Sequence, residues 1–154
     1  MNIADLITPR SVVAQLRAAN KKHALQELAK RAASMTGCNE RAIYDVLIER
    51  ERLGSTGIGR GVGIPHGKLC GLSKLYGIFA RLERPVPFEA IDDQPVDLIF
   101  VLLTPDGAGA DHLKALARVS RLLRDRAVCA KLRGTDSADA LYALLTEDRA
   151  SDAA

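Results

Sequence analysis

The sequence predicts an α/β fold in which helices lie on either side of one small β-sheet. Short runs rich in β-branched and aromatic residues alternate along the chain with stretches whose apolar residues recur at helical spacing. Residues 96–103 form the most hydrophobic run, and a short run of this kind is typical of a central strand covered on both faces. A length of 154 residues suits one domain with one core.

The first part of the chain predicts one strand and two helices. A short strand is expected within residues 11–16. A helix is expected over residues 21–36, where Gly37 follows as a stop signal and the apolar stripe is Leu25, Leu28, Ala29, Ala32 and Ala33. Asn39 is expected to cap a second helix, which Gly54 ends.

The middle of the chain predicts three further strands. Residues 62–64 are expected to be a short strand that delivers His66, with a loop over residues 67–73. Residues 75–82 are expected to be a strand, and the prolines after it make residues 84–88 a connector. The apolar run described above is the last predicted strand.

Three helices are expected after the last strand. Asp111 is expected to cap the first of them, whose apolar stripe would be Leu113, Leu116, Ala117, Ser120 and Leu123. A short helix is expected over residues 127–133, and Ser137 is expected to cap a final helix over residues 138–145. The tail from residue 147 is expected to fray.

Composition excludes several classes of protein. Aromatic residues make up only 4% of the chain and the net charge is +3, so neither base stacking nor nucleic-acid binding is predicted. No signal peptide and no run of about 18 apolar residues is present, so no membrane insertion is predicted. Three widely spaced cysteines fit free thiols in a reducing compartment. The expected location is therefore the cytoplasm.

Residues 54–67 hold six of the 12 glycines and end in Pro65-His66-Gly67. Glycine at this density indicates positive φ angles or a close approach to the backbone. The stretch fits neither the P-loop pattern G-x-x-x-x-G-K-[ST] nor the dinucleotide pattern G-x-G-x-x-G, so nucleotide binding is not predicted. The three histidines lack a short metal-ligand spacing and no G-x-S-x-G motif is present, so neither metal nor cofactor is predicted.

The residues that remain suit a phosphate group carried on a histidine. His66 is the candidate nucleophile, because a neutral imidazole nitrogen is nucleophilic near pH 7. Helical spacing places Arg50 on the inward side of its helix, where its guanidinium could neutralise phosphate oxygens. His112, at the start of a later helix, is a third candidate. Further candidate phosphate contacts are hydroxyl and backbone N–H groups of the loop, namely Ser55, Thr56, Gly57 and Gly67.

The same residues also have structural interpretations. His66 could be an ordinary loop residue, and His112 could have no role beyond the start of its helix. Arg50 could pair with Asp97, Glu51 or another carboxylate. The hydroxyl groups before Gly57 could only shape the turn.

Two stretches together resemble a known family. Residues 50–69 read RERLGSTGIGRGVGIPHGKL, and residues 88–98 read FEAIDDQPVDL. The first is closely similar to the phosphorylation-site region of the fructose/mannitol-type enzyme IIA domains of the bacterial phosphotransferase system. The second is similar to a later stretch of the same domains, and His112-Leu113 follows it at a helix start. The resemblance covers about residues 3–146.

The resemblance implies a single three-layer domain over residues 1–146, with a mixed β-sheet flanked by helices on both sides and a flexible tail over residues 147–154. It implies that His66 is phosphorylated, typically on Nε2, by a small HPr-like carrier that enzyme I loads from phosphoenolpyruvate. Arg50 matches the active-site arginine of the family, and His112 matches its second active-site histidine. A phosphohistidine donor requires no metal and no nucleotide.

Two functions stay open within this family. The sequences of both stretches are most similar to the nitrogen-regulatory branch, in which a phosphocarrier regulates target proteins according to its phosphorylation state. The alternative is a sugar-specific IIA component that passes phosphate to the IIB domain of a fructose/mannitol-type permease. The absence of a fused transporter or carrier domain favours the regulatory function. A third class, a relative with an inactive site, is disfavoured because Arg50, His66 and His112 are all present.

Overall fold

A computed structural model describes residues 1–147, and the expected tail beyond Glu147 lies outside the described residues. Six strands form one sheet in the order β1-β5-β6-β3-β2, and β4 also pairs with β6. The strands are β1 (Val12–Leu16), β2 (Gly57–Gly59), β3 (Val62–Gly63), β4 (His66–Lys68), β5 (Tyr76–Val86) and β6 (Val96–Thr104). Parallel pairs join β1 to β5 and both β3 and β4 to β6, while β5 and β6 are antiparallel. The sheet is therefore mixed, as expected.

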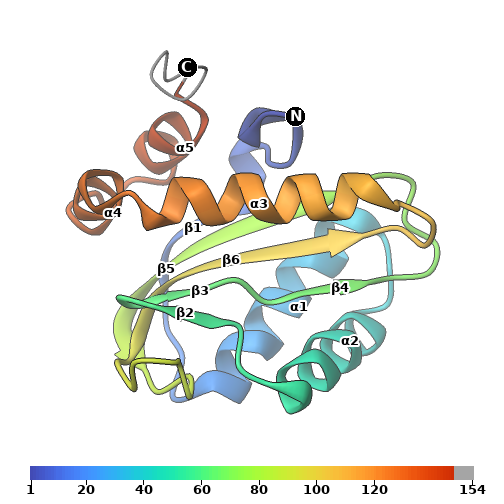
Figure 1. The fold of residues 1–154 in the computed structure, drawn as a ribbon, viewed down its shortest axis with the longest axis horizontal. Coiled ribbons are helices and arrows are strands. Elements are labelled where there is room, and N and C mark those ends of the chain that lie inside the picture. Colours follow the sequence, from blue (N-terminus) through green and yellow to red (C-terminus); the bar gives the residue numbers. More distant parts are fainter. Residues whose placement is uncertain (148–154) are drawn as a thin grey trace.

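Helices cover both faces of this sheet (Figure 1). One face carries α1 (Lys21–Thr36) and α2 (Glu40–Leu53), and the other carries α3 (Ala110–Arg124), α4 (Arg126–Arg133) and α5 (Ala138–Thr146). Two short 3₁₀ helices, Ile3–Asp5 and Pro9–Ser11, precede β1. The three-layer α/β prediction is confirmed.

Local signals account for most helix ends. The side chain of Asn20 accepts the His23 N–H at 2.8 Å at the start of α1, and Asn39 accepts the Ala42 N–H at 3.0 Å at the start of α2. Gly37 ends α1 with a left-handed φ of 77°, a conformation that glycine adopts without steric cost. The predicted cap at Asn39 and the predicted stop at Gly37 are thus observed.

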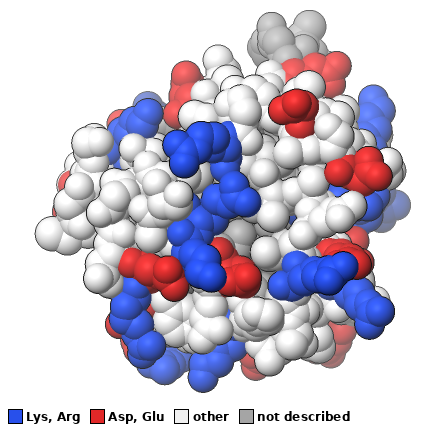
Figure 2. All heavy atoms as spheres, turned by 180° about the vertical axis from the view of Figure 1, so that it is seen from behind, with Lys and Arg blue, Asp and Glu red and all other residues white. Residues whose placement is uncertain are grey.

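The surface carries charges of both signs. Figure 2 shows the side opposite to that of Figure 1, where basic residues form a band through the middle and acidic residues adjoin its lower end. Interspersed charges of this kind are typical of solvated faces rather than of one extended electrostatic field.

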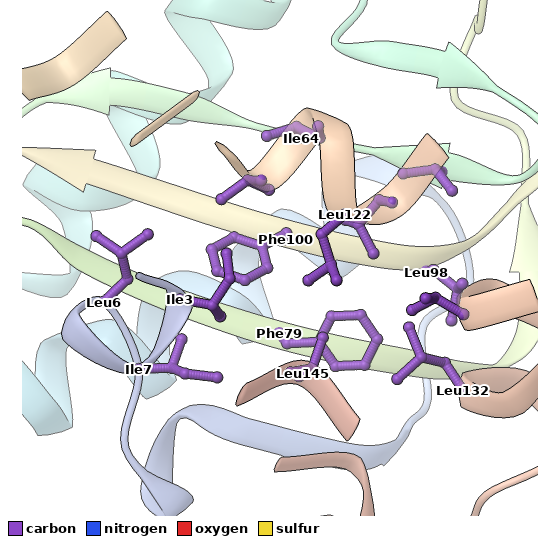
Figure 3. Packing of buried hydrophobic residues seen from close by; sticks show 14 of the residues in the cluster. Ile3, Leu6, Ile7, Ile64, Phe79, Leu98, Phe100, Leu122, Leu132 and Leu145 are labelled. Carbon is purple, nitrogen blue, oxygen red and sulfur yellow. The ribbon is translucent and has the colours of Figure 1, made fainter. Parts of the chain in front are cut away.

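The strand β6 separates two hydrophobic clusters. Leu98 and Phe100 point into the cluster beneath α3, α4 and α5, which we call the α3-side cluster (Figure 3). Leu102 belongs to the same cluster. Ile99, Val101 and Leu103 point into the cluster beneath α1 and α2, which we call the α1-side cluster. All six side chains are fully buried, so β6 is the central strand that its continuous apolar sequence predicts.

Two sequence predictions in the middle of the chain are wrong in detail. The loop expected over residues 67–73 starts later, because His66–Lys68 form β4, whose backbone pairs with β6. Strand β5 continues to Val86 through the expected connector. The last β1–β5 pair is Leu16–Leu82, so β1 does not pair with β5 at Pro85. The missing N–H group of Pro85 therefore removes no hydrogen bond to β1.

The helix α3 also differs from its prediction. It begins at Ala110 with Gly109 as N-cap, so Asp111 lies in the first turn rather than at the cap. Its buried stripe is Ala115, Val119, Leu122 and Leu123, whereas the expected Leu113 is 66% exposed. Leu113 instead lies at the open end of the helix beside His112, because Ala115, Val119 and Leu122 are the residues that pack in the α3-side cluster.

Candidate functional site

His66 is held by the central part of the sheet. It pairs with Leu102 in the parallel β4–β6 ladder, and the Pro65 carbonyl just before it accepts the Leu102 N–H at 2.9 Å. Because Leu102 lies in a fully buried strand, this pairing fixes the backbone from which the imidazole projects. The residue itself is half-buried, so its ring is supported by the protein and open on one side.

One hydrogen bond defines the protonation of the His66 ring. Nδ1 lies 2.8 Å from the carbonyl oxygen of Ile64. A carbonyl oxygen can only accept, so Nδ1 carries the proton in this contact. In the neutral ring, Nε2 then holds the free lone pair, which is the form a nucleophile requires.

His112 lies beside His66 in the first turn of α3. The centroids of the two rings are 5.9 Å apart and the ring planes are inclined by 47°. Burial lowers the pKa of His112, and the nearby charges of His66 and Lys68 lower this pKa further. The Nδ1 atom of His112 is buried and has no hydrogen-bond partner among the described residues. The structure therefore brings together the imidazole of His66, whose Nδ1 donates to Ile64, and a second imidazole that favours its neutral form.

Arg50 projects from the last turn of α2, the helix that packs against β4. Val46, one turn earlier on the same side of α2, lies so close to β4 that a methyl group on Gly67 would come within 2.3 Å of its Cγ1. Gly67 therefore permits the close approach of the helix that carries Arg50. Arg50 is half-buried at the rim, and its Nη1 donates to the Gly54 carbonyl at 2.9 Å.

The alternative ion-pair roles of Arg50 are not observed. Asp97 pairs with Arg133 at 2.9 Å, and Glu51 pairs with Lys21 at 2.9 Å. Within residues 1–147 no carboxylate forms an ion pair with Arg50. Its guanidinium is thus available for an external anion.

The hydroxyl groups of the glycine loop already have partners. The Ser55 hydroxyl donates to the Phe88 carbonyl at 2.6 Å and accepts the Gly57 N–H at 3.0 Å. The backbone N–H of Thr56 donates to Glu51 at 3.1 Å, and its hydroxyl bonds the same carboxylate. In this structure these groups shape the loop, and their contact with phosphate stays a prediction.

Glu51 is a residue of the site that the sequence reasoning missed. It is buried and joins Lys21 of α1 to Thr56 of the loop through its two oxygens. Its spacing of four residues from Leu47, itself four residues after Ile43, could have placed it on the buried stripe of α2. The buried carboxylate thereby connects both helices of one layer to the start of the glycine loop.

Two other kinds of site are absent from the described residues. Residues 1–147 contain no cluster of three or more His, Cys, Asp or Glu side chains arranged to hold a metal ion. No helix within the same residues has the length and apolar character needed to cross a membrane.

The fold and site match one protein family. A family model described as "Phosphoenolpyruvate-dependent sugar phosphotransferase system, EIIA 2" matches residues 5–148. The chain therefore belongs to the type-2 enzyme IIA family of the phosphotransferase system, and the family resemblance read from the sequence is confirmed.

Individual relatives point to one branch of this family. The chain is 57% identical to a nitrogen regulatory protein of Bradyrhizobium diazoefficiens over 94% of its own length and 95% of the relative. It is 37% identical to a nitrogen regulatory protein of Klebsiella oxytoca over 96% of this chain and 91% of that one. The crystal structure of nitrogen regulatory protein IIA-Ntr from Neisseria meningitidis superposes with a TM-score of 0.88 at 33% identity, covering 94% of this chain and 99% of that one.

Proposed function

We propose that this protein is a phosphocarrier of the nitrogen branch of the phosphotransferase system, which accepts a phosphoryl group on Nε2 of His66. The hydrogen bond from Nδ1 of His66 to the Ile64 carbonyl carries this proposal. It presents the Nε2 lone pair before a donor arrives, so His66 does not have to lose a proton for the new bond to form. The donor is a phosphorylated HPr-like carrier protein.

The transfer balances without a cofactor. The Nε2 lone pair attacks phosphorus, the Nε2–P bond forms and the N–P bond of the donor breaks. The electron pair of the broken bond stays on the donor's ring nitrogen. The Nδ1 proton of His66 stays in place, and its bond to the Ile64 carbonyl strengthens as the ring gains positive character.

Arg50 and His112 would stabilise the phosphoryl group during transfer. Phosphoryl transfer relies on positioning and on neutralisation of the equatorial oxygens, which a guanidinium can contact in pairs. Arg50 has no acidic partner among the described residues, so it can serve this role. A neutral His112 can donate one N–H group to an oxygen, and the first turn of α3 favours negative charge at the same place.

Phosphorylation would also act as a signal to regulatory target proteins. A phosphate group adds roughly 1.5 to 2 negative charges at neutral pH to a surface that now presents two imidazoles and a guanidinium. This change of sign alters which partners bind there. The nitrogen-regulatory relative with 57% identity supports this function over the sugar-specific alternative.

Phosphorylation with two purified carriers tests the proposal. The protein is incubated with enzyme I, phosphoenolpyruvate and either a nitrogen-branch or a sugar-branch HPr-like carrier, and the phosphate is counted by mass spectrometry and ³¹P NMR. We expect one acid-labile, base-stable phosphate on the wild type, none on His66→Ala, and faster loading by the nitrogen-branch carrier. His23→Ala is the matched control, because His23 lies on α1 and accepts the Ala19 N–H at 3.0 Å.

Two outcomes of this assay contradict the proposal. Phosphate on the His66→Ala protein would show that another residue is the acceptor. Efficient onward transfer to a purified fructose-type or mannitol-type IIB domain, with preferential loading by the sugar-branch carrier, would place the protein in sugar transport instead.

A further inference from the structure

A hollow lies at the end of the sheet opposite to His66. Its volume is about 350 Å³, which falls within the range of small-molecule sites. Four of its lining residues are arginines contributed by the β2–β3 turn, α3 and α4, namely Arg60, Arg124, Arg126 and Arg133. The rest of the lining is Leu123, Cys129 and Ala130.

This hollow is separate from the His66 site. Asp97, which holds Arg133, lies near the start of β6, whereas Leu102 pairs with His66 five residues further on. Five residues of strand span roughly 17 Å. The helix α3 runs between the two places, with His112 in its first turn and Arg124 as its last residue. Figure 1 shows α4 and β4 at opposite ends of the molecule.

One of the four arginines is built into the fold. The Nε atom of Arg133 donates to both oxygens of Asp97, at 2.9 and 3.1 Å, and its Nη2 donates to the Arg60 carbonyl at 2.7 Å. Gly61 makes room for this pair, because a methyl group there would lie 2.6 Å from Nη2 of Arg133. Arg133 therefore forms a rigid wall of the hollow.

The other three guanidinium groups lack such a partner. Arg124 and Arg126 are exposed, as is Arg60, and within residues 1–147 none of the three forms an ion pair with a carboxylate. The neighbouring acids are occupied elsewhere. Asp125 caps α4 by accepting the Ala127 N–H at 3.0 Å, and Asp92 accepts the backbone N–H of Arg60 at 2.8 Å.

We propose that this arginine hollow binds a small phosphate monoester that carries an apolar or ring-containing body. The guanidinium groups match phosphate oxygens in geometry and charge, and planar guanidinium groups also stack on rings. The buried side chains of Leu123 and Cys129 provide apolar surface for the body of the ligand. This binding does not depend on phosphate transfer to His66.

Titration with three probes tests the proposal. Adenosine 5′-monophosphate, inorganic phosphate and adenosine are each added to the full chain, and binding is followed by calorimetry and by backbone amide NMR shifts. We expect saturable binding of adenosine 5′-monophosphate with a Kd of about 1 mM or below. Inorganic phosphate and adenosine should each bind more weakly, because each supplies only part of the contact.

Charge variants connect this binding to the hollow. The double variant Arg124→Gln/Arg126→Gln removes two exposed charges that form no ion pair within residues 1–147, and it should raise the Kd about tenfold or more. Arg121→Gln is the control, because it removes one arginine charge on the exposed side of α3 outside the hollow. It should leave the Kd within about twofold.

Several results would overturn the proposal. These are the absence of saturable binding, equal affinity for inorganic phosphate and the monoester, or an unchanged Kd in the double variant. Tighter binding of an octaglutamate peptide than of adenosine 5′-monophosphate would show that the hollow binds an acidic protein segment instead. His66→Ala should bind the monoester as the wild type does, so failure of the phosphotransfer proposal and failure of this one are distinguishable.

Discussion

The two histidines of the site lie in different environments although their rings are only 5.9 Å apart. His66 satisfies one ring nitrogen with the Ile64 carbonyl and leaves the other as a base. His112 has a buried ring nitrogen without a partner, and burial lowers its pKa. The two environments therefore differ in a way that supports the proposed role of His66 as acceptor of phosphate and of His112 as its neutral neighbour.

The lowered pKa of His112 predicts a dependence of stability on pH. In the unfolded chain this pKa returns to its ordinary value of 6.5. As the pH falls through that value, the unfolded state takes up a proton that the folded state does not, so the free energy of unfolding decreases. The loss from this group continues until the pH reaches the lower pKa of the folded state. We expect urea unfolding of the wild type to show this loss below about pH 6.5.

The variant His112→Gln isolates this contribution. It keeps a polar side chain but does not titrate, so its stability should fall less steeply than that of the wild type over the same pH range. Contributions of other groups, including His66 and Lys68 that face His112, are present in both proteins. Parallel profiles for the two proteins would show that His112 does not carry the effect, and an NMR titration of its ring would locate the pKa directly.

At the scale of elements, the site depends on how closely α2 approaches β4. The sequence predicts α2 well but indicates β4 poorly. Residues 66–68 carry no β-branched or aromatic side chain, so their strand character comes from pairing with β6 and not from their own propensity. The approach itself depends on Gly67 opposite Val46, a contact between residues of two elements that helical and strand periodicities do not reveal.

Gly67→Ala is expected to push α2 away from β4. The added methyl group would lie 2.3 Å from Cγ1 of Val46, and overpacking of this kind costs about 1–3 kcal/mol of unfolding free energy. Because Arg50 is on the same helix, phosphate transfer to His66 should also slow. Chemical denaturation and the carrier assay measure the two effects on one preparation.

A second substitution provides the control for this experiment. Val46→Ala removes the contacted atom, so the double variant Gly67→Ala/Val46→Ala should recover a large part of both losses. Wild-type stability and rate in Gly67→Ala alone would contradict the packing argument.

At the scale of the whole molecule, the sequence predicts the layers well and the site in part. The central strand, the helices α1 and α2 and the cap of α2 follow from local composition, and the structure confirms them. The inward side of α3 was wrong because packing on the α3-side cluster, and not periodicity alone, decides which face of the helix is buried. The spacing of Glu51 places it on the buried stripe of α2, but that spacing does not reveal Lys21 on another helix, the partner of its charge. Local periodicity therefore does not reveal contacts between elements that are distant in sequence.

The strand β6 makes the two hydrophobic clusters unfold together. Leu98 belongs to the α3-side cluster and Ile99 to the α1-side cluster, and both are fully buried on one strand. Substitution of either by alanine should lower the free energy of unfolding by about 2–5 kcal/mol. Since every layer packs on this strand, circular dichroism and methyl NMR signals from both clusters should report one transition in each variant. Leu53→Ala, at a leucine that is 85% exposed, should change the same free energy by less than about 0.5 kcal/mol. Separate loss of the α1 and α2 layer in Ile99→Ala would show instead that the two faces fold as independent units.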